Sequence, residues 1–325
     1  MVKPYKLQRM EESQRIKRKD FLKQTLYLVG FGALANSPVS VLAQTEPKTI
    51  CILHTNDWHS RIDPFPLADK NLGGQGGAAV RATLINKIRK EEGELLLLDS
   101  GDIFQGTPYF NFYGGELEYK LMSEMGYDCV TLGNHDFDNG IDGIIKQMPH
   151  AKFDFVNANY DFSKSLLKEK IHPYKIYRKN GLKIGVFGLG IELNGLVPDK
   201  LCKGVVYHDP IKVANIIAEE LKFKKKCDLV ICLSHLGFKY KEKKVRDEIL
   251  ATQTQNIDLI LGGHTHTFLP EPIFYENIIH QKVIVNQVGW AGLQLGKVKF
   301  TFEPFVNTAK QVSSELFSLT NIQKV

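Results

Sequence analysis

The chain has 325 residues, with 42 Lys/Arg against 36 Asp/Glu, and 43% of its residues are hydrophobic. This length accommodates one large domain or two ordinary ones, and the composition is typical of a globular protein. Residues 1–43 hold eight of the basic side chains and three of the acidic ones, so the rest of the chain is nearly neutral. A nearly neutral body excludes the broad basic surface of a nucleic-acid-binding protein.

The first 43 residues are typical of an export signal. A basic start is followed by the apolar stretch Leu26–Ala35, which is far shorter than the ~20 residues needed to span a bilayer. The sequence Val-Leu-Ala then ends at Ala43, where we predict cleavage by a signal peptidase. Arg18-Lys19 resembles a twin-arginine signal with Lys in second place, so the Tat and the Sec routes both stay open. We expect an exported, periplasmic protein without a stable membrane span; an amphipathic membrane helix over 15–35 is the alternative.

From residue 48 onward, apolar runs alternate with helical patterns. The stretch Ala78–Glu92 has apolar residues at helical spacing, and Leu95–Leu98 is wholly apolar, as strands buried on both faces are. In chain order the first half contains predicted strands over 49–54, 95–98, 128–132 and 153–156, and predicted helices over 78–92, 116–125 and 141–148.

The pattern changes after Tyr174. Two alternating runs meet at Asn180-Gly181, a dipeptide that favours the tight turn of a β-hairpin. The second half contains predicted strands over 174–177, 182–190, 229–233, 259–261, 283–288 and 295–302, and predicted helices over 211–223 and within 241–251. Mixed parallel and antiparallel patterns predict an α/β fold of two packed sheets covered outside by helices. We place it in one domain over 48–305, followed by a polar tail over 306–325.

Six short motifs carry the functional information, and the first five each end a strand-like run. They are HTNDWHS (His54–Ser60), DSGDIFQG (Asp99–Gly106), TLGNHDFDNG (Thr131–Gly140), CLSHLG (Cys232–Gly237), GGHTH (Gly262–His266) and, more weakly, NQVGWAGLQLG (Asn286–Gly296). Active-site groups gather at the carboxyl ends of strands in α/β proteins. Seven metal-capable side chains therefore converge if these strands lie side by side: Asp57, His59, Asp102, Asn134, His235, His264 and His266.

This set fits two adjacent divalent cations. Asp102 is the natural bridge, because a bridging ligand must be an anion with two free oxygens. Asp57 and His59 are two residues apart, so both can reach one ion from an extended tip, and His264 and His266 have the same spacing.

Asn134 adds a neutral carbonyl oxygen, and His235 completes the second site. Mixed His, Asp and Asn ligands suit Mn, Zn, Fe or Co, whereas a structural zinc site would use thiolates. Two such cations ~3.5–4 Å apart lower the pKa of a bridging water and clamp a phosphate, so that the resulting hydroxide can attack phosphorus in line.

His135 directly follows a predicted ligand and is expected to point toward the leaving group. There it can stabilise the phosphate oxygens or protonate the leaving alkoxide, which makes Asn134 and His135 the predicted substrate-binding residues. Asp138 lies three residues further on and can orient the His135 ring. Two neighbours are expected to support the site: His54 as a buried residue beside the ligands, and Asp136 by fixing the turn around His135.

The same motifs resemble the calcineurin-like metallophosphoesterases, specifically their 5′-nucleotidase branch. The resemblance covers nearly all of 50–302 and includes GGQGGAAVRATLINKIR, LLLLDSGDIFQGT and IDLILGGHTH. It implies a four-layer αββα sandwich and a hydrolase that cleaves phosphate monoesters such as 5′-nucleotides with a metal-bridging hydroxide. By the same resemblance, Asp57, His59, Asp102 and His266 bind one ion, Asp102, Asn134, His235 and His264 bind the other, and His135 with Asp138 forms the catalytic dyad.

One departure from this family leaves the substrate open. Full-length 5′-nucleotidases carry a C-terminal domain that holds the nucleoside, and no second domain fits here. We therefore expect a small phosphate ester or nucleotide as substrate, and a separately encoded nucleotidase C-terminal-domain protein as a possible partner. The alternatives are a 2′,3′-cyclic-nucleotide phosphodiesterase, an enzyme for sulfur-linked substrates, and a non-catalytic binding subunit, against which the intact His135–Asp138 pair argues.

Overall fold

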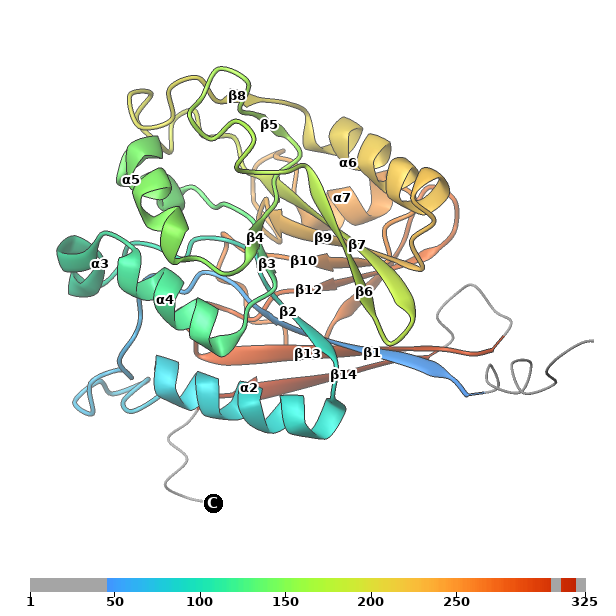
Figure 1. Cartoon of the computed structure of the whole chain (residues 1–325), viewed down its shortest axis with the longest axis horizontal. Coiled ribbons are helices and arrows are strands. Elements are labelled where there is room, and N and C mark those ends of the chain that lie inside the picture. The colour runs from blue at the N-terminus through green and yellow to red at the C-terminus, as the bar shows by residue number, and fades with distance from the viewer. Residues whose placement is uncertain (1–45, 305–310, 320–325) are drawn as a thin grey trace, which may run out of the picture. The chain divides into compact units, whose positions relative to one another are not determined.

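The computed structural model describes residues 46–304 and 311–319 (Figure 1). The predicted signal over 1–43 lies outside these residues. The described chain forms two six-stranded sheets and one small two-stranded sheet, made of β5 (Tyr160–Asp161) and β8 (Val206–Tyr207). None of its helices is both long and apolar enough to cross a bilayer.

The first sheet has the strand order β14-β13-β1-β2-β3-β4. Strands β1 to β4 run parallel, β13 pairs antiparallel with β1, and β14 pairs antiparallel with β13. The strands span Lys48–Thr55 (β1), Leu95–Asp99 (β2), Cys129–Val130 (β3), Asp154–Phe155 (β4), Gln294–Phe302 (β13) and Gln311–Ser318 (β14).

The second sheet has the order β11-β12-β10-β9-β7-β6. Its four central strands are parallel, and the edge strands β11 and β6 are antiparallel to their neighbours. The strands span Tyr174–Lys179 (β6), Leu182–Gly190 (β7), Leu229–His235 (β9), Leu259–Leu261 (β10), Ile273–Glu276 (β11) and Lys282–Asn286 (β12). The hairpin of β6 and β7 turns at Asn180-Gly181, both with positive φ, as the dipeptide predicted.

The two sheets pack face to face, and helices cover the outer faces (Figure 1). Along β1, Ile50 and Ile52 enter the core between the sheets, while Cys51 and Leu53 enter the core under the helices of the first sheet. Both faces of the strand are buried, which explains its continuous apolar run. The first sheet is covered by α2 (Ala78–Glu92), α4 (Glu116–Met125) and α5 (Gly140–Gln147), and the second by α6 (Pro210–Glu219) and α7 (Asp247–Gln253). The predicted four-layer αββα architecture is confirmed.

The sequence analysis missed α3 (Pro108–Tyr113), the strands β5 and β8, and the edge strands β11 and β14. The last of these, Gln311–Ser318, lies within the predicted tail over 306–325 and extends the first sheet by one strand. Its side chains are mostly exposed and polar. A strand held mainly by backbone hydrogen bonds at a solvated edge leaves no apolar alternation in the sequence.

Candidate dinuclear metal centre

All seven predicted metal ligands lie at the carboxyl ends of parallel strands, where the two sheets meet. Asp57 and His59 follow β1, Asp102 follows β2, Asn134 follows β3, His235 ends β9, and His264 and His266 follow β10. Six of them form two groups in which one ligand atom per residue lies within 4.8 Å of the others. We call Asp57, His59 and His266 the first cluster, and Asp102, His235 and His264 the second cluster.

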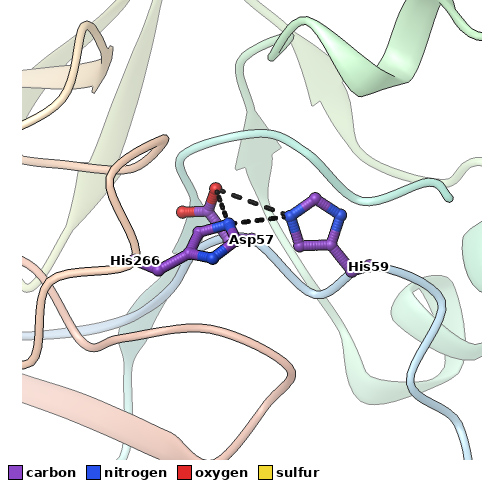
Figure 2. A group of neighbouring side chains, drawn as sticks. All are labelled: Asp57, His59 and His266. Carbon is purple, nitrogen blue, oxygen red and sulfur yellow. Dashed lines mark hydrogen bonds and ion pairs between the residues drawn. The ribbon is translucent and has the colours of Figure 1, made fainter. Parts of the chain in front are cut away.

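The first cluster joins the loop after β1 to the loop after β10 (Figure 2). The Nε2 atoms of His59 and His266 are 2.9 Å apart, and Asp57 Oδ1 lies 3.3 Å from His266 Nε2 and 3.9 Å from His59 Nε2. Asp57 also holds the second loop in place, because its carboxylate accepts the backbone N–H of His264. Two imidazole nitrogens and a carboxylate oxygen therefore face one another.

In the second cluster, Asp102 and His235 are buried and His264 is partly buried. Asp102 Oδ2 lies 3.1 Å from His235 Nε2, and the same oxygen lies 3.9 Å from His59 Nε2 of the first cluster. Asp102 thus stands between the clusters, where the sequence analysis placed the bridge. Asn134 Oδ1 lies 2.8 Å from His264 Nδ1 and adds a carbonyl oxygen to this side.

The backbone at these ligands is unusual. Non-glycine residues seldom adopt positive φ, and each such residue costs about 1 kcal/mol, although His and Asp adopt it more often than most. Left-handed backbone is nevertheless found at five of the seven ligands: Asp57 (φ 50°), His59 (51°), Asp102 (56°), His264 (70°) and His266 (52°). The tip that carries Asp57 and His59 is therefore a turn, and not the extended backbone expected from the sequence.

The donor atoms and charges fit a pair of cations. His235 Nε2 is buried and forms no hydrogen bond with any residue that the structure describes, although Asp102 is close. Burial alone would raise the pKa of Asp102, but His235 and His59 hold it below its ordinary range, so the carboxylate is charged. Burial lowers the pKa of His264 to about 4, which keeps this imidazole neutral, as a metal ligand must be.

His135 and Asp138 lie beside the clusters. The backbone N–H of His135 donates to Asp102 Oδ1 (2.8 Å), and its Nδ1 atom pairs with Asp138 Oδ2 (3.0 Å). The hydrogen bond that His135 donates to the Asp138 carboxylate raises the pKa of His135, which favours the imidazolium form. The His135 side chain is 38% exposed, so it can meet a molecule that arrives from solvent.

Of the two residues expected to support the site, Asp136 contacts the ligand turns, whereas His54 is buried but bonds elsewhere. Asp136 is buried and accepts the backbone N–H groups of Asp102, Ile103 and Gly133, which fixes the turns that carry Asp102 and His135. His54 is fully buried, and its Nε2 atom pairs with the side-chain amide of Asn286 rather than facing a cluster.

Sequence reasoning missed four residues that hold the ligands. The carbonyl of Ser100 pairs with His235 Nδ1 (2.6 Å), and the side-chain amide of Asn56 donates to Asp57 Oδ2 (2.7 Å). Trp290 stacks parallel to His266 with ring centroids 5.3 Å apart, and Gln287 contacts the loop of His264 and His266. A signal existed for Gln287, since two polar residues interrupt the apolar run after Val283.

Comparisons with known proteins agree with this geometry. The model of the calcineurin-like phosphoesterase family matches residues 51–268. The 5′-nucleotidase of Vibrio cholerae is 35% identical over 260 residues, which cover 77% of this chain and 45% of that protein. The trifunctional nucleotide phosphoesterase protein YfkN of Bacillus subtilis is 32% identical over 286 residues, which cover 78% of this chain and 18% of that protein.

Among solved structures, the 5′-nucleotidase precursor from Thermus thermophilus is similar with a TM-score of 0.76 and 30% identity, over 84% of this chain and 55% of that one. This chain thus spans less than half of the length of the two curated relatives. The family match, the shared fold and the paired His/Asp clusters together show that the chain belongs to the calcineurin-like phosphoesterases and is related to the 5′-nucleotidases.

Proposed function

We propose that this protein hydrolyses phosphate monoesters, with 5′-nucleotides as its main substrates. The observation that carries the proposal is the arrangement of two His/Asp clusters on either side of Asp102, with His135 bonded to the same carboxylate through its backbone. The similarity to the 5′-nucleotidase of Vibrio cholerae supports the choice of substrate.

In this proposal each cluster holds one divalent cation. Asp57, His59 and His266 hold the first, His235, His264 and Asn134 hold the second, and Asp102 contacts both. When bound, the two cations supply the nucleophile and the positive charge that a phosphoryl transfer needs. The ligand types fit Mn, Zn, Fe or Co.

The remaining residues act on the substrate. Asp138 holds His135 Nδ1, which fixes the ring and leaves Nε2 for the ester. From there His135 stabilises the phosphate oxygens or donates a proton to the leaving alkoxide. Asn134 precedes it on the same turn, so its side-chain amide also lies within reach of a phosphate bound between the clusters.

The test is phosphate release by the full chain after chelation and after separate addition of Mn²⁺, Zn²⁺, Co²⁺ or Fe²⁺. We expect AMP and related 5′-nucleotides to be cleaved only after a metal is restored. The matched control is Asp128→Asn, which alters an acid just before β3, at the end of the strand away from the ligands, and should keep the same metal dependence. Full activity in the presence of excess chelator would refute the proposal.

A second candidate is a phosphodiesterase that opens 2′,3′-cyclic nucleotides. The similarity to YfkN favours it, because that protein is described as a trifunctional nucleotide phosphoesterase. The same assay distinguishes the two, with cyclic nucleotides as substrates and the nucleotide product measured directly. A higher kcat/KM for the cyclic ester than for AMP would make the phosphodiesterase the principal function.

We also propose that the protein is exported to the periplasm by a signal over 1–43. The proposal is supported by the basic start, the short apolar stretch and the small residues that end at Ala43. N-terminal sequencing of the protein from a periplasmic fraction should begin at Gln44. Recovery of the intact chain from the cytoplasm alone would contradict it.

A partner is the last element of the proposal. We propose that a separately encoded nucleotidase C-terminal-domain protein completes the nucleoside site; the aligned part of the Vibrio cholerae 5′-nucleotidase is 45% of that protein, and its remainder is not aligned. Addition of such a protein should lower KM for AMP and leave KM for a small ester, such as p-nitrophenyl phosphate, unchanged. An ordinary micromolar KM for AMP in the isolated chain would exclude an obligatory partner.

A further inference from the structure

The two clusters are linked through one short loop. Within Gly262–His266, His264 belongs to the second cluster and His266 to the first, and both have left-handed backbone. A two-residue step therefore sets how far apart these two ligands lie. Left-handed backbone at non-glycine residues persists only where contacts with the surrounding structure hold it, because the loop would otherwise adopt a less strained conformation.

Gln287 supplies that support. It follows β12, is fully buried, and its side chain uses both ends of the amide on this loop. Its Nε2 donates to the carbonyl of Gly263, and its Oε1 accepts the backbone N–H of Thr267 (3.0 Å) and the hydroxyl of Thr265 (3.1 Å). The bonds to Gly263 and Thr265 bracket His264, and those to Thr265 and Thr267 bracket His266.

The contacts of Gln287 also extend to the other ligand loops. The Thr265 hydroxyl accepts the backbone N–H of Phe238, three residues after His235. On the other side, Asn56 accepts the backbone N–H of Val288, next to Gln287, while its amide binds Asp57. Ligand loops from both sheets are therefore tied to the segment that carries Gln287.

We propose that Gln287 is a positioning residue that sets the spacing between His264 and His266. Through this spacing it sets the distance between the two metal sites. It is not itself a ligand. The inference rests on the proposed metal centre and adds a residue outside all the predicted ligands. Residues that hold ligands in this way change metal affinity by about 10- to 100-fold when they are replaced.

The experiment compares Gln287→Met and Gln287→Glu with wild type, and uses Gln147→Met as the matched control. Gln147 is also a buried glutamine, but it lies at the end of α5, outside the loops that carry the predicted ligands. The readouts are the two Mn²⁺ dissociation constants from calorimetry, the electron paramagnetic resonance signal of the coupled Mn²⁺ pair, and the unfolding temperature of the metal-free protein.

We expect Gln287→Met to weaken both Mn²⁺ binding steps by about 10- to 100-fold and to change the spin coupling, because the distance between the ions is no longer fixed. Gln287→Glu retains the acceptor for Thr265 and Thr267 but loses the donor to Gly263, so its affinities should fall between those of wild type and Gln287→Met. Gln147→Met should bind Mn²⁺ as wild type does.

Unchanged affinities and coupling in Gln287→Met would overturn the inference, as would equal weakening in Gln147→Met. Loss of the metal-free fold in both Gln287 variants would overturn it too, because the residue would then serve the fold rather than the spacing. A wild-type protein that fails to bind two Mn²⁺ ions is a distinguishable outcome, since it removes the proposed function itself.

Discussion

The two clusters are held in different ways. In the second cluster, His235 ends a central strand, is fully buried, and has its distal nitrogen bonded to the Ser100 carbonyl. In the first cluster, both histidines lie on loops, and the His266 side chain is 39% exposed. Its ring is held by stacking on Trp290 rather than by a hydrogen bond to its distal nitrogen in the described chain.

This difference predicts unequal sites. A ligand fixed by a strand and a hydrogen bond loses little freedom when it binds a cation, whereas an exposed ring held by packing loses more. We therefore expect the second cluster to bind its cation more tightly and the first to exchange its cation with solvent. Four predictions, ordered from the largest expected effect to the smallest, concern the two clusters and the residues beside them.

The largest effect should follow Asp102→Asn, because this carboxylate serves both clusters. The variant retains an oxygen that can accept the His135 N–H but loses the shared charge. We expect both cations to be lost on desalting and turnover to fall by at least ~10³-fold. Elemental analysis and phosphate release measure this; two retained equivalents of Mn²⁺ would show that Asp102 is not shared.

His135→Ala should abolish most turnover and leave both clusters loaded. His135 contributes to neither cluster, so only the step on the ester is affected, by at least ~10²-fold in kcat. Elemental analysis of the variant is the internal control. Wild-type kcat would refute the role of His135, and loss of one metal equivalent would assign it to a cluster instead.

Trp290→Leu should affect the metal affinity of the first cluster and not that of the second. Without the stacked ring, His266 gains freedom, and we expect the weaker of the two Mn²⁺ binding steps to weaken by a further ~10-fold while the tighter step is unchanged. Trp290→Phe retains an aromatic face and should restore most of the affinity. Equal weakening of both steps would show that the two clusters are not independently held.

The smallest effect concerns His54, which belongs to neither cluster. Burial lowers the pKa of His54 from 6.5 to about 3. Between these two pH values His54 is therefore protonated in the unfolded chain and neutral in the folded chain. The contribution of neutral His54 to the free energy of unfolding is fully present above pH 6.5. It is lost as the pH falls toward 3, by about 1.4 kcal/mol per pH unit.

His54→Gln removes this dependence. The difference in unfolding free energy between the metal-free variant and wild type should therefore narrow between pH 6.5 and pH 5. The other histidines are common to both proteins, so their contribution cancels in the difference. Parallel pH profiles for the two proteins would show that His54 is not buried in its neutral form.

The elements that sequence reasoning located well are those with two buried faces or a strong local signal. Strand β10 and helices α2 and α4 have the predicted bounds, because continuous apolar runs and helical spacing mark them. The strand β14 and the helix α3 escaped, since their positions depend on partners rather than on their own residues. The sequence of a solvent-exposed edge strand shows little hydrophobic periodicity, so such a strand is hard to predict.

The residues of the site also differ in how well the sequence predicts them. The convergence of the predicted ligands could be foreseen because His, Asp and Asn after strand-like runs can be recognised one motif at a time. The groups that hold them were not, because the contact of Gln287 with Thr267 or of Asn56 with Val288 joins residues from different motifs. Which amide meets which loop is decided by the packing of two sheets, and that information is not local.

The left-handed backbone at five predicted ligands has a consequence for attempts to raise the thermal stability of this protein. Glycine adopts this conformation without steric cost, so selection for the stability of the metal-free chain alone favours glycine wherever the replaced side chain makes no other contact. Each such replacement would remove an imidazole or a carboxylate from the clusters.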